Sequence, residues 1–174
     1  MKPPREHATR NAQTYFVTAT TWERRALFKS ERWARLFMKT LHSYRGRAYS
    51  LHEYVLMPEH FHILITPLVA LERAVQFIKG GFSFRAKREL KSSMEVWQRG
   101  FSDHRIRDAE DYVRHIDYIF LNPVGRNLAT SAGEYPYCSR FPGSDKDEIP
   151  RWLKPLEIVD PCGTASAVPF QSKI

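Results

Sequence analysis

Four stretches of the chain carry the apolar, β-branched and aromatic residues that are typical of β-strands. The first strand is expected at residues 15–22. The runs 52–57 and 61–66 flank Pro58, which fits the first corner of a tight turn, so they predict an antiparallel hairpin. The fourth strand is expected within the aromatic and basic stretch 96–107.

Between these strands, apolar residues recur at three- and four-residue spacing and predict helices. The first helix follows Ser30, whose side chain can cap it, and Gly46 suits its end. The second follows Pro67, and Gly80 with Gly81 should weaken or bend it at its middle. The order strand, helix, strand, strand, helix, strand predicts an α+β, ferredoxin-like βαββαβ fold, an antiparallel sheet with helices on one face.

A third helix is expected after the last strand, starting from Asp108, whose side chain can cap it. It should end at Asn122, because Pro123 disfavours helical geometry at the residue before it. We expect this helix to belong with the sheet to one domain, residues 1–142. The remaining residues, 143–174, predict an irregular tail with ordered loops around Trp152 and Leu153.

Two histidines interrupt the apolar pattern of the third strand, one residue apart. Because successive side chains of a strand point to opposite faces, His60 and His62 should lie on one face, and Phe61 and Ile63 on the other. Neutral imidazoles are common ligands of divalent metals, so the pair could hold one cation. The alternative is a pair of histidines on a solvated face without a function.

Charge changes this picture by indicating a partner. The chain has 27 Lys and Arg against 19 Asp and Glu, a formal net charge of +8, which favours a polyanion such as nucleic acid or an acidic membrane surface. The stretch 1–13 lacks the apolar centre of a signal peptide, and no run of about 18 apolar residues could span a membrane. Cys138 and Cys162 match no metal or redox spacing. We therefore expect a cytoplasmic protein with reduced thiols and no membrane partner.

The third predicted helix carries a tyrosine outside its apolar stripe. That stripe consists of Tyr112, Val113, Ile116, Ile119 and Phe120. At about 100 degrees per residue, Tyr118 lies roughly 140 degrees from the centre of the stripe. His115, Tyr118 and Asn122 fall together instead, at three- and four-residue spacing. Ordinary packing of an amphipathic tyrosine is the alternative interpretation.

These motifs support a resemblance to a known family. His60-Phe61-His62, in the setting Met-Pro-Glu-His-Phe-His-Ile-Leu, resembles the histidine, hydrophobic, histidine motif of the HUH nucleases. The stretch 117–124 resembles the nucleophile helix of the single-tyrosine transposases. The stretches 96–101 and 135–137 make the chain similar to the REP-associated tyrosine transposases within that group. The resemblance covers roughly residues 12–142.

The resemblance implies a role for each matching residue. Tyr118 matches the nucleophile that attacks a phosphodiester of single-stranded DNA and forms a 5′-phosphotyrosine link. His60 and His62 match the metal-binding pair, and Asn122 matches the polar third ligand, which is glutamine in related transposases. The family's substrates are repetitive extragenic palindromes, recognised as a hairpin with an adjoining 5′ tetranucleotide. Manganese or magnesium fits the reaction, and a zinc ion would be expected to want a third nitrogen or sulfur ligand.

The basic residues suggest where the DNA binds. We expect Arg85, Lys87 and Arg99 to contact the backbone, and Trp97 to lie in an aromatic region that stacks on unpaired bases. His104 and His115 could orient a ligand or relay a proton, and neither is assigned a role. Such a basic cluster is also compatible with an ordinary solvated helix face.

Two other functions remain open at this point. One is a metal-dependent nuclease that uses water and keeps Tyr118 for structure. The other is a protein that binds palindromic DNA without cutting it. The resemblance suggests a monomer, although other single-tyrosine transposases are dimers, and Tyr118 could act with the histidines of its own chain or of a partner.

Overall fold

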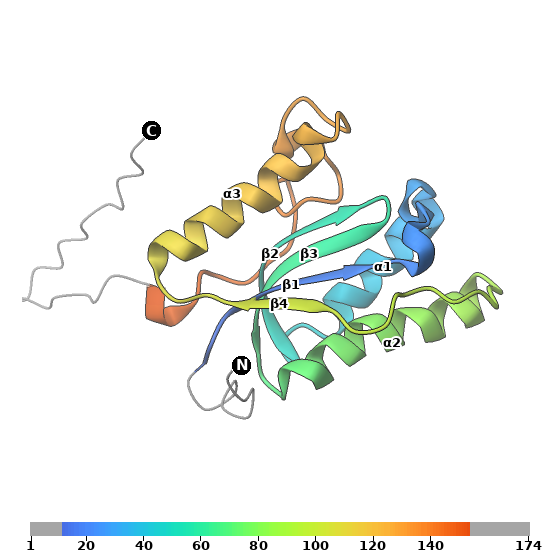
Figure 1. Ribbon diagram of the computed structural model, residues 1–174, viewed down its shortest axis with the longest axis horizontal. Coiled ribbons are helices and arrows are strands. Elements are labelled where there is room, and N and C mark those ends of the chain that lie inside the picture. Colours follow the sequence, from blue (N-terminus) through green and yellow to red (C-terminus); the bar gives the residue numbers. More distant parts are fainter. Residues whose placement is uncertain (1–11, 154–174) are drawn as a thin grey trace, which may run out of the picture.

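The computed structural model describes residues 12–153, which form a four-stranded antiparallel sheet and three α-helices (Figure 1). The strands are β1 (Tyr15–Thr20), β2 (Tyr49–Met57), β3 (His60–Pro67) and β4 (Ser102–Arg105). The α-helices are α1 (Glu31–Ser43), α2 (Leu71–Glu89) and α3 (Ala109–Gly125). The spatial order β2-β3-β1-β4, with α1 and α2 as the connections, confirms the predicted ferredoxin-like arrangement.

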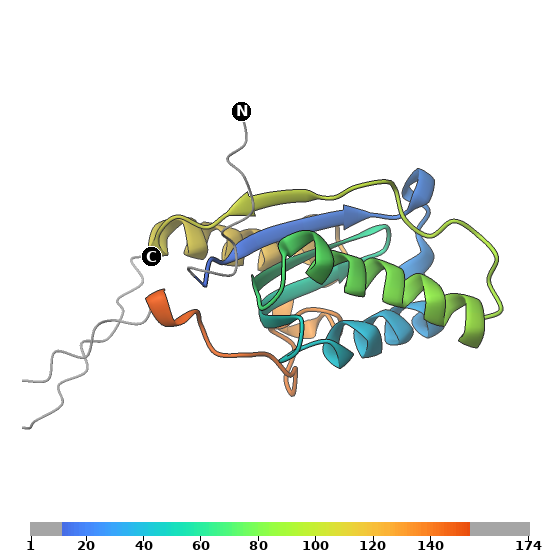
Figure 2. The same ribbon diagram turned by 90° about the horizontal axis from the view of Figure 1, so that it is seen from below.

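The helices divide between the two faces of the sheet. Figures 1 and 2 show α1 and α2 on one face and α3 on the opposite face. Phe61 and Ile63 of β3 belong to the larger core, which includes the buried residues of α1 and α2. Leu64 belongs to a second core with Ile119 of α3. The alternation of β3 therefore directs its two histidines toward α3.

The predicted hairpin is confirmed and slightly longer than expected. β2 and β3 pair from Tyr49 with Pro67 to Met57 with His60, so the turn consists of Pro58 and Glu59. The carbonyl oxygens of both turn residues accept backbone hydrogen bonds from the segment after β1, at 3.0 and 2.9 Å. The start of β3 is thus held in place on both sides.

The α2 helix is continuous through the two glycines that were expected to weaken or bend it. The helix continues through Gly80 and Gly81. A Cβ atom on Gly81 would lie 2.7 Å from the hydroxyl of Tyr44, which follows the end of α1. The glycine therefore allows close packing of the two helices, and the gain from that packing offsets its low helix propensity. Ser30 precedes α1 as predicted, but its side chain forms no capping hydrogen bond.

The prediction that the third helix ends at Asn122 is wrong. Asp108 caps α3 as expected, with Oδ1 accepting from the Asp111 amide at 2.8 Å, but the helix continues to Gly125 with Pro123 inside it. Pro123 has no amide N–H to donate, but the amides after it still close the final turn of the helix. The Arg126 amide, for example, donates to the Asn122 carbonyl at 3.2 Å. Asn122 therefore stays helical, one turn after Tyr118.

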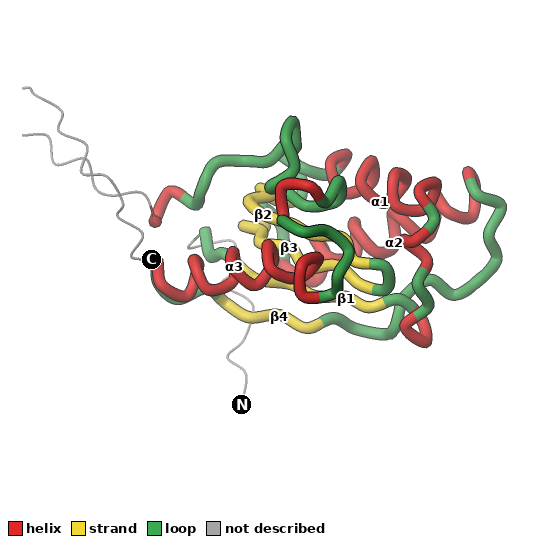
Figure 3. The backbone as a smooth tube through the Cα atoms, turned by 90° about the horizontal axis from the view of Figure 1, so that it is seen from above, coloured by secondary structure: helices red, strands yellow, loops and turns green. Residues whose placement is uncertain are grey.

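The fourth strand is much shorter than its predicted range. Only Ser102–Arg105 pair with β1, and before them a long loop joins α2 to β4 (Figure 3). Within this loop Trp97 forms an isolated bridge with Thr21. Among residues 12–153, no helix is long and apolar enough to cross a membrane.

The described part of the expected tail packs against the sheet. The Asp147 carboxylate accepts hydrogen bonds from the Leu51 amide at 2.7 Å and from Arg45 Nε at 2.9 Å. Residues 151–153 form a short 3-10 helix, and Trp152 Nε1 donates to the Thr14 hydroxyl at 3.3 Å. The expectations for residues 1–11, for residues 154–174 and for Cys162 lie outside the described residues.

Candidate active site

His60 and His62 lie side by side on the face of β3 that α3 covers. Their ring centroids are 4.6 Å apart, and the residues are only 6% and 4% exposed. Burial lowers the pKa of both imidazoles, and for His62 the neighbouring His60 and Arg126 contribute to a pKa of about 3. Both rings are therefore neutral at pH 7, which is the form that binds a metal ion.

One ring nitrogen of His62 has a partner and the other has none. Thr18 lies opposite His62 on β1, and its hydroxyl is 2.7 Å from Nδ1. Nε2 is buried without a hydrogen bond. An unpaired buried nitrogen is costly unless a ligand satisfies it. A divalent cation at Nε2 fits this arrangement, because the threonine can hold the tautomer whose lone pair is on Nε2.

Glu59 is a residue of this site that sequence reasoning missed. Its Oε1 lies 3.3 Å from His60 Nδ1, 3.4 Å from the Arg24 guanidinium and 3.2 Å from that of Arg126. The side chain is 12% exposed. The contacts connect the turn before His60 to Arg126, which caps the end of α3. The carboxylate was visible in the sequence, but its partners come from distant segments.

The structure places Tyr118 beside the histidines of its own chain. Its ring stands edge-on to His62, with centroids 5.0 Å apart, and it also packs on Phe16 at 5.8 Å. The tyrosine is 51% exposed, so solvent and substrate can reach it. Asn122 is next to it on α3, with Nδ2 3.4 Å from the Tyr118 carbonyl oxygen. The four residues implied by the resemblance thus come from β3 and α3 of one chain.

A second polar group lies on the other side of Phe16. Asp111 Oδ2 is 2.8 Å from His104 Nε2, and His115 Nδ1 is 3.3 Å from Asp111 Oδ1. Burial opposes ionisation of Asp111, but hydrogen bonds from His104 and the Arg107 amide hold its pKa below its usual value. The three residues line a cavity of about 430 Å³ together with Phe16, Arg107, Arg114 and Tyr118.

The expected DNA contacts are not gathered at this site. Arg85 and Lys87 are on α2, so they lie across the sheet from α3. Arg99 is exposed in the loop before β4. Trp97 is 5% exposed in the larger core, and its Nε1 donates to the Lys79 carbonyl at 3.1 Å. This burial contradicts the expectation that the Trp97 ring stacks on bases.

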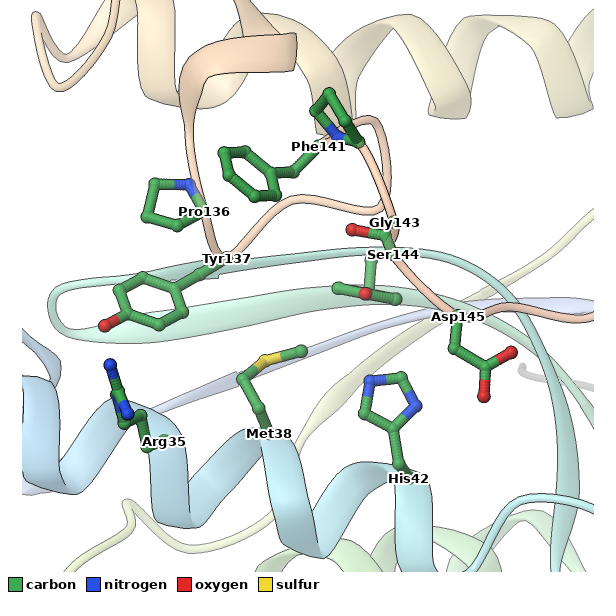
Figure 4. Close-up of a pocket in the computed structure, with 11 residues that line it drawn as sticks. Arg35, Met38, His42, Pro136, Tyr137, Phe141, Gly143, Ser144 and Asp145 are labelled. Atoms are coloured by element: carbon green, nitrogen blue, oxygen red, sulfur yellow. The ribbon is translucent and has the colours of Figure 1, made fainter.

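The motif Tyr135-Pro136-Tyr137 has a structural role beside β2. Tyr135 donates its hydroxyl to the Leu56 carbonyl at 2.9 Å, and the Leu56 amide donates to the Tyr137 carbonyl at 2.9 Å. Pro136 and Tyr137 also line a cavity of about 400 Å³ between this segment and α1 (Figure 4). Arg35 and His42 of α1 border the same cavity. The cavity shares no residue with the His60, His62 and Tyr118 site.

The chain is similar to known proteins in sequence and in fold. Residues 9–119 match the family described as transposase IS200 like. A REP-associated tyrosine transposase of Escherichia coli is 26% identical over 152 residues, which are 83% of this chain and 83% of that protein. A solved structure of a REP-associated tyrosine transposase bound to a REP hairpin superposes with a TM-score of 0.60 at 24% identity. It covers 74% of this chain and 76% of the other, and it supports the fold.

Proposed function

Since the chain belongs to the IS200-like transposase family, we propose that it cleaves and rejoins single-stranded DNA through a 5′-phosphotyrosine formed by Tyr118. The observation that carries this proposal is the contact between the exposed Tyr118 ring and His62, whose Nε2 is buried and unpaired. The proposed nucleophile is therefore a neighbour of a proposed cation ligand, as attack on a cation-bound phosphate would require.

His60, His62 and Asn122 are the residues that would hold the cation, and manganese or magnesium suits the chemistry. When bound, such a cation makes the scissile phosphate more electrophilic and stabilises its developing charge. Tyr118 supplies the attacking oxygen, and the ester that it forms conserves the energy of the broken bond. Rejoining therefore needs no ATP.

The proposed substrate is a DNA hairpin of the REP type with unpaired flanking nucleotides. The E. coli relative and the solved structure are both named for REP elements. The net charge of +8 is appropriate for a polyanion. Arg85, Lys87 and Arg99 remain proposed DNA contacts, although the first two would need DNA that extends around the sheet edge. We further propose that the protein acts in the cytoplasm.

The geometry favours a monomer that uses Tyr118 in cis. Tyr118 contacts His62 and lies next to Asn122 on α3, all within one chain. Ile119 of α3 belongs to the same core as Leu64 of β3, so the helix that carries Tyr118 is packed on the strand that carries both histidines.

The test is formation of a covalent adduct. The full chain is incubated with a 5′-labelled and, separately, a 3′-labelled single-stranded hairpin in MnCl₂, and the products are separated under denaturing conditions. The label 3′ to the cleavage site should move with the protein, and Tyr118→Phe should abolish the adduct while retaining DNA binding. Tyr137→Phe, which removes a phenol hydroxyl at the separate cavity beside α1, is the matched control and should form the adduct as the wild type does.

The same experiment separates the alternatives. Cleavage without an adduct, unchanged in Tyr118→Phe, would identify a nuclease that uses water. Intact DNA that binds equally well in chelator would identify a binding protein. Either result would refute the proposed strand transfer.

A further inference from the structure

The cluster of His104, Asp111 and His115 has the geometry of an oriented base. Asp111 is 6% exposed, and its low pKa keeps the carboxylate ionised at neutral pH. Oδ2 accepts the backbone amide of Arg107 at 3.1 Å and is 2.8 Å from His104 Nε2. An ionised carboxylate only accepts hydrogen bonds, so His104 carries its proton on Nε2.

The position of the proton on His115 follows in the same way. Its Nδ1 is 2.7 Å from the Asp111 carbonyl oxygen and 3.3 Å from Asp111 Oδ1. Both oxygens are acceptors, so Nδ1 donates and the neutral ring has its lone pair on Nε2. A carboxylate that fixes a histidine through Nδ1 leaves Nε2 as a general base.

Tyr118 is the nucleophile candidate beside this base. His115 and Tyr118 are three residues apart on α3, which makes them neighbours on the helix surface. Both line the cavity of about 430 Å³, and Phe16 contacts both rings, at 4.7 and 5.8 Å. Arg107 and Arg114 line the cavity, and Phe16 stacks on His62. The cavity therefore suits an anionic group next to the phenol.

We propose that His115 is the catalytic base that accepts the proton of Tyr118, with Asp111 and His104 as its positioning residues. The inference deepens the proposed strand transfer and rests on it. During cleavage the Tyr118 Oη–P bond forms, the phenol proton moves to His115 Nε2, and the P–O3′ bond breaks while solvent protonates the 3′ oxygen. During rejoining a 3′-hydroxyl attacks and gives its proton to solvent, the O3′–P bond forms, the Tyr118 Oη–P bond breaks, and the departing Tyr118 oxygen recovers the proton from His115.

Reversibility explains why a histidine suits this position. Phenol has a reference pKa of about 10, so it needs a base at neutral pH, and the same group must act as an acid when the phosphotyrosine is resolved. Imidazole gains and loses its proton in that range. The Asp111 carboxylate, with Oδ1 3.3 Å from His115 Nδ1, orients the ring.

The cluster could alternatively hold a cation, because its candidate ligand atoms lie within 4.8 Å of one another. The hydrogen bonds favour proton transfer instead. Nε2 of His104 and Nδ1 of His115 both direct protons at Asp111, and a cation between them would have to displace those protons.

Single-turnover adduct formation between pH 5.5 and 9 tests the proposal. His115→Ala should lower the rate at neutral pH by about 10²- to 10⁴-fold, and added imidazole should restore part of it. His115→Gln, which retains an N–H for Asp111, should be equally slow and should retain the fold and DNA affinity. His42→Ala, which removes a half-buried histidine of α1, is the matched control and should keep the wild-type rate.

Three results would overturn the proposal. One is a wild-type rate in both His115 variants. Another is a His115→Ala protein that binds DNA normally and forms the adduct slowly, but whose rate is not restored by imidazole and keeps the wild-type pH profile. The third is a Mn²⁺ or Zn²⁺ ion that binds calorimetrically to a His60→Ala/His62→Ala protein and is lost with His115. If the wild-type protein forms no adduct, the proposed function itself fails and His115 has no reaction to serve.

Discussion

The Thr18 hydroxyl should strengthen metal binding although it is not a ligand. This hydroxyl is the hydrogen-bond partner of His62 Nδ1, at 2.7 Å, and Thr18→Val removes it with little change in shape. The variant leaves a buried ring nitrogen without a partner, which costs about 1–3 kcal/mol of folding stability. Loss of an outer-shell hydrogen bond to a ligating histidine typically lowers metal affinity about 10- to 100-fold.

Calorimetric titration of the full chain with MnCl₂, together with urea unfolding of the metal-free protein, measures both effects. A 10- to 100-fold weaker Kd corresponds to about 1.4–2.8 kcal/mol. Thr20→Val is the matched control, because Thr20 is on the same strand opposite His60. An unchanged Mn²⁺ affinity in Thr18→Val would refute the argument that this hydroxyl selects the His62 tautomer, whatever happens to stability.

Three further changes test other parts of the structure. Glu59→Gln should weaken Mn²⁺ binding and lower the rate of adduct formation, because it loosens His60 and the end of α3. An unchanged Mn²⁺ affinity would mean that Glu59 acts only through its contacts with arginines. Burial lowers the pKa of His52 below 6.5, so the unfolded chain binds more protons than the folded chain on acidification. The free energy of unfolding, measured with urea at pH 7.5 and pH 5, should therefore fall below pH 6.5 by up to about 1.4 kcal/mol per pH unit. The loss should be smaller in His52→Gln. Gly80→Ala should raise the stability measured by thermal unfolding by about 1 kcal/mol, because its Cβ atom would meet nothing closer than 3.9 Å. Gly81→Ala should not show this gain, because its Cβ atom would clash with Tyr44. Equal gains in the two variants would contradict the close packing of Gly81 on Tyr44.

Local pattern determined much of the fold. The hairpin could be predicted from the β-forming residues around Pro58. The cap of α3 could be predicted because the Asp108 side chain accepts a hydrogen bond from an amide only three residues later. The alternation of β3 correctly placed His60 and His62 on the same face, because side-chain direction in a strand depends only on neighbouring residues. Family resemblance added the roles of Tyr118 and Asn122. Periodicity alone does not specify how far these two residues lie from the histidines.

Tertiary structure decided what depends on distant partners. Gly81 belongs within a helix because Tyr44 packs on it, and Pro123 is tolerated because the following amides find acceptors. Trp97 was expected at a DNA surface, but its ring fills the core between Phe28 and Phe61. Glu59 and Asp111 acquire their roles only from Arg126, His104 and His115, since burial and charge partners change a carboxylate's chemistry and are not encoded in its immediate neighbours.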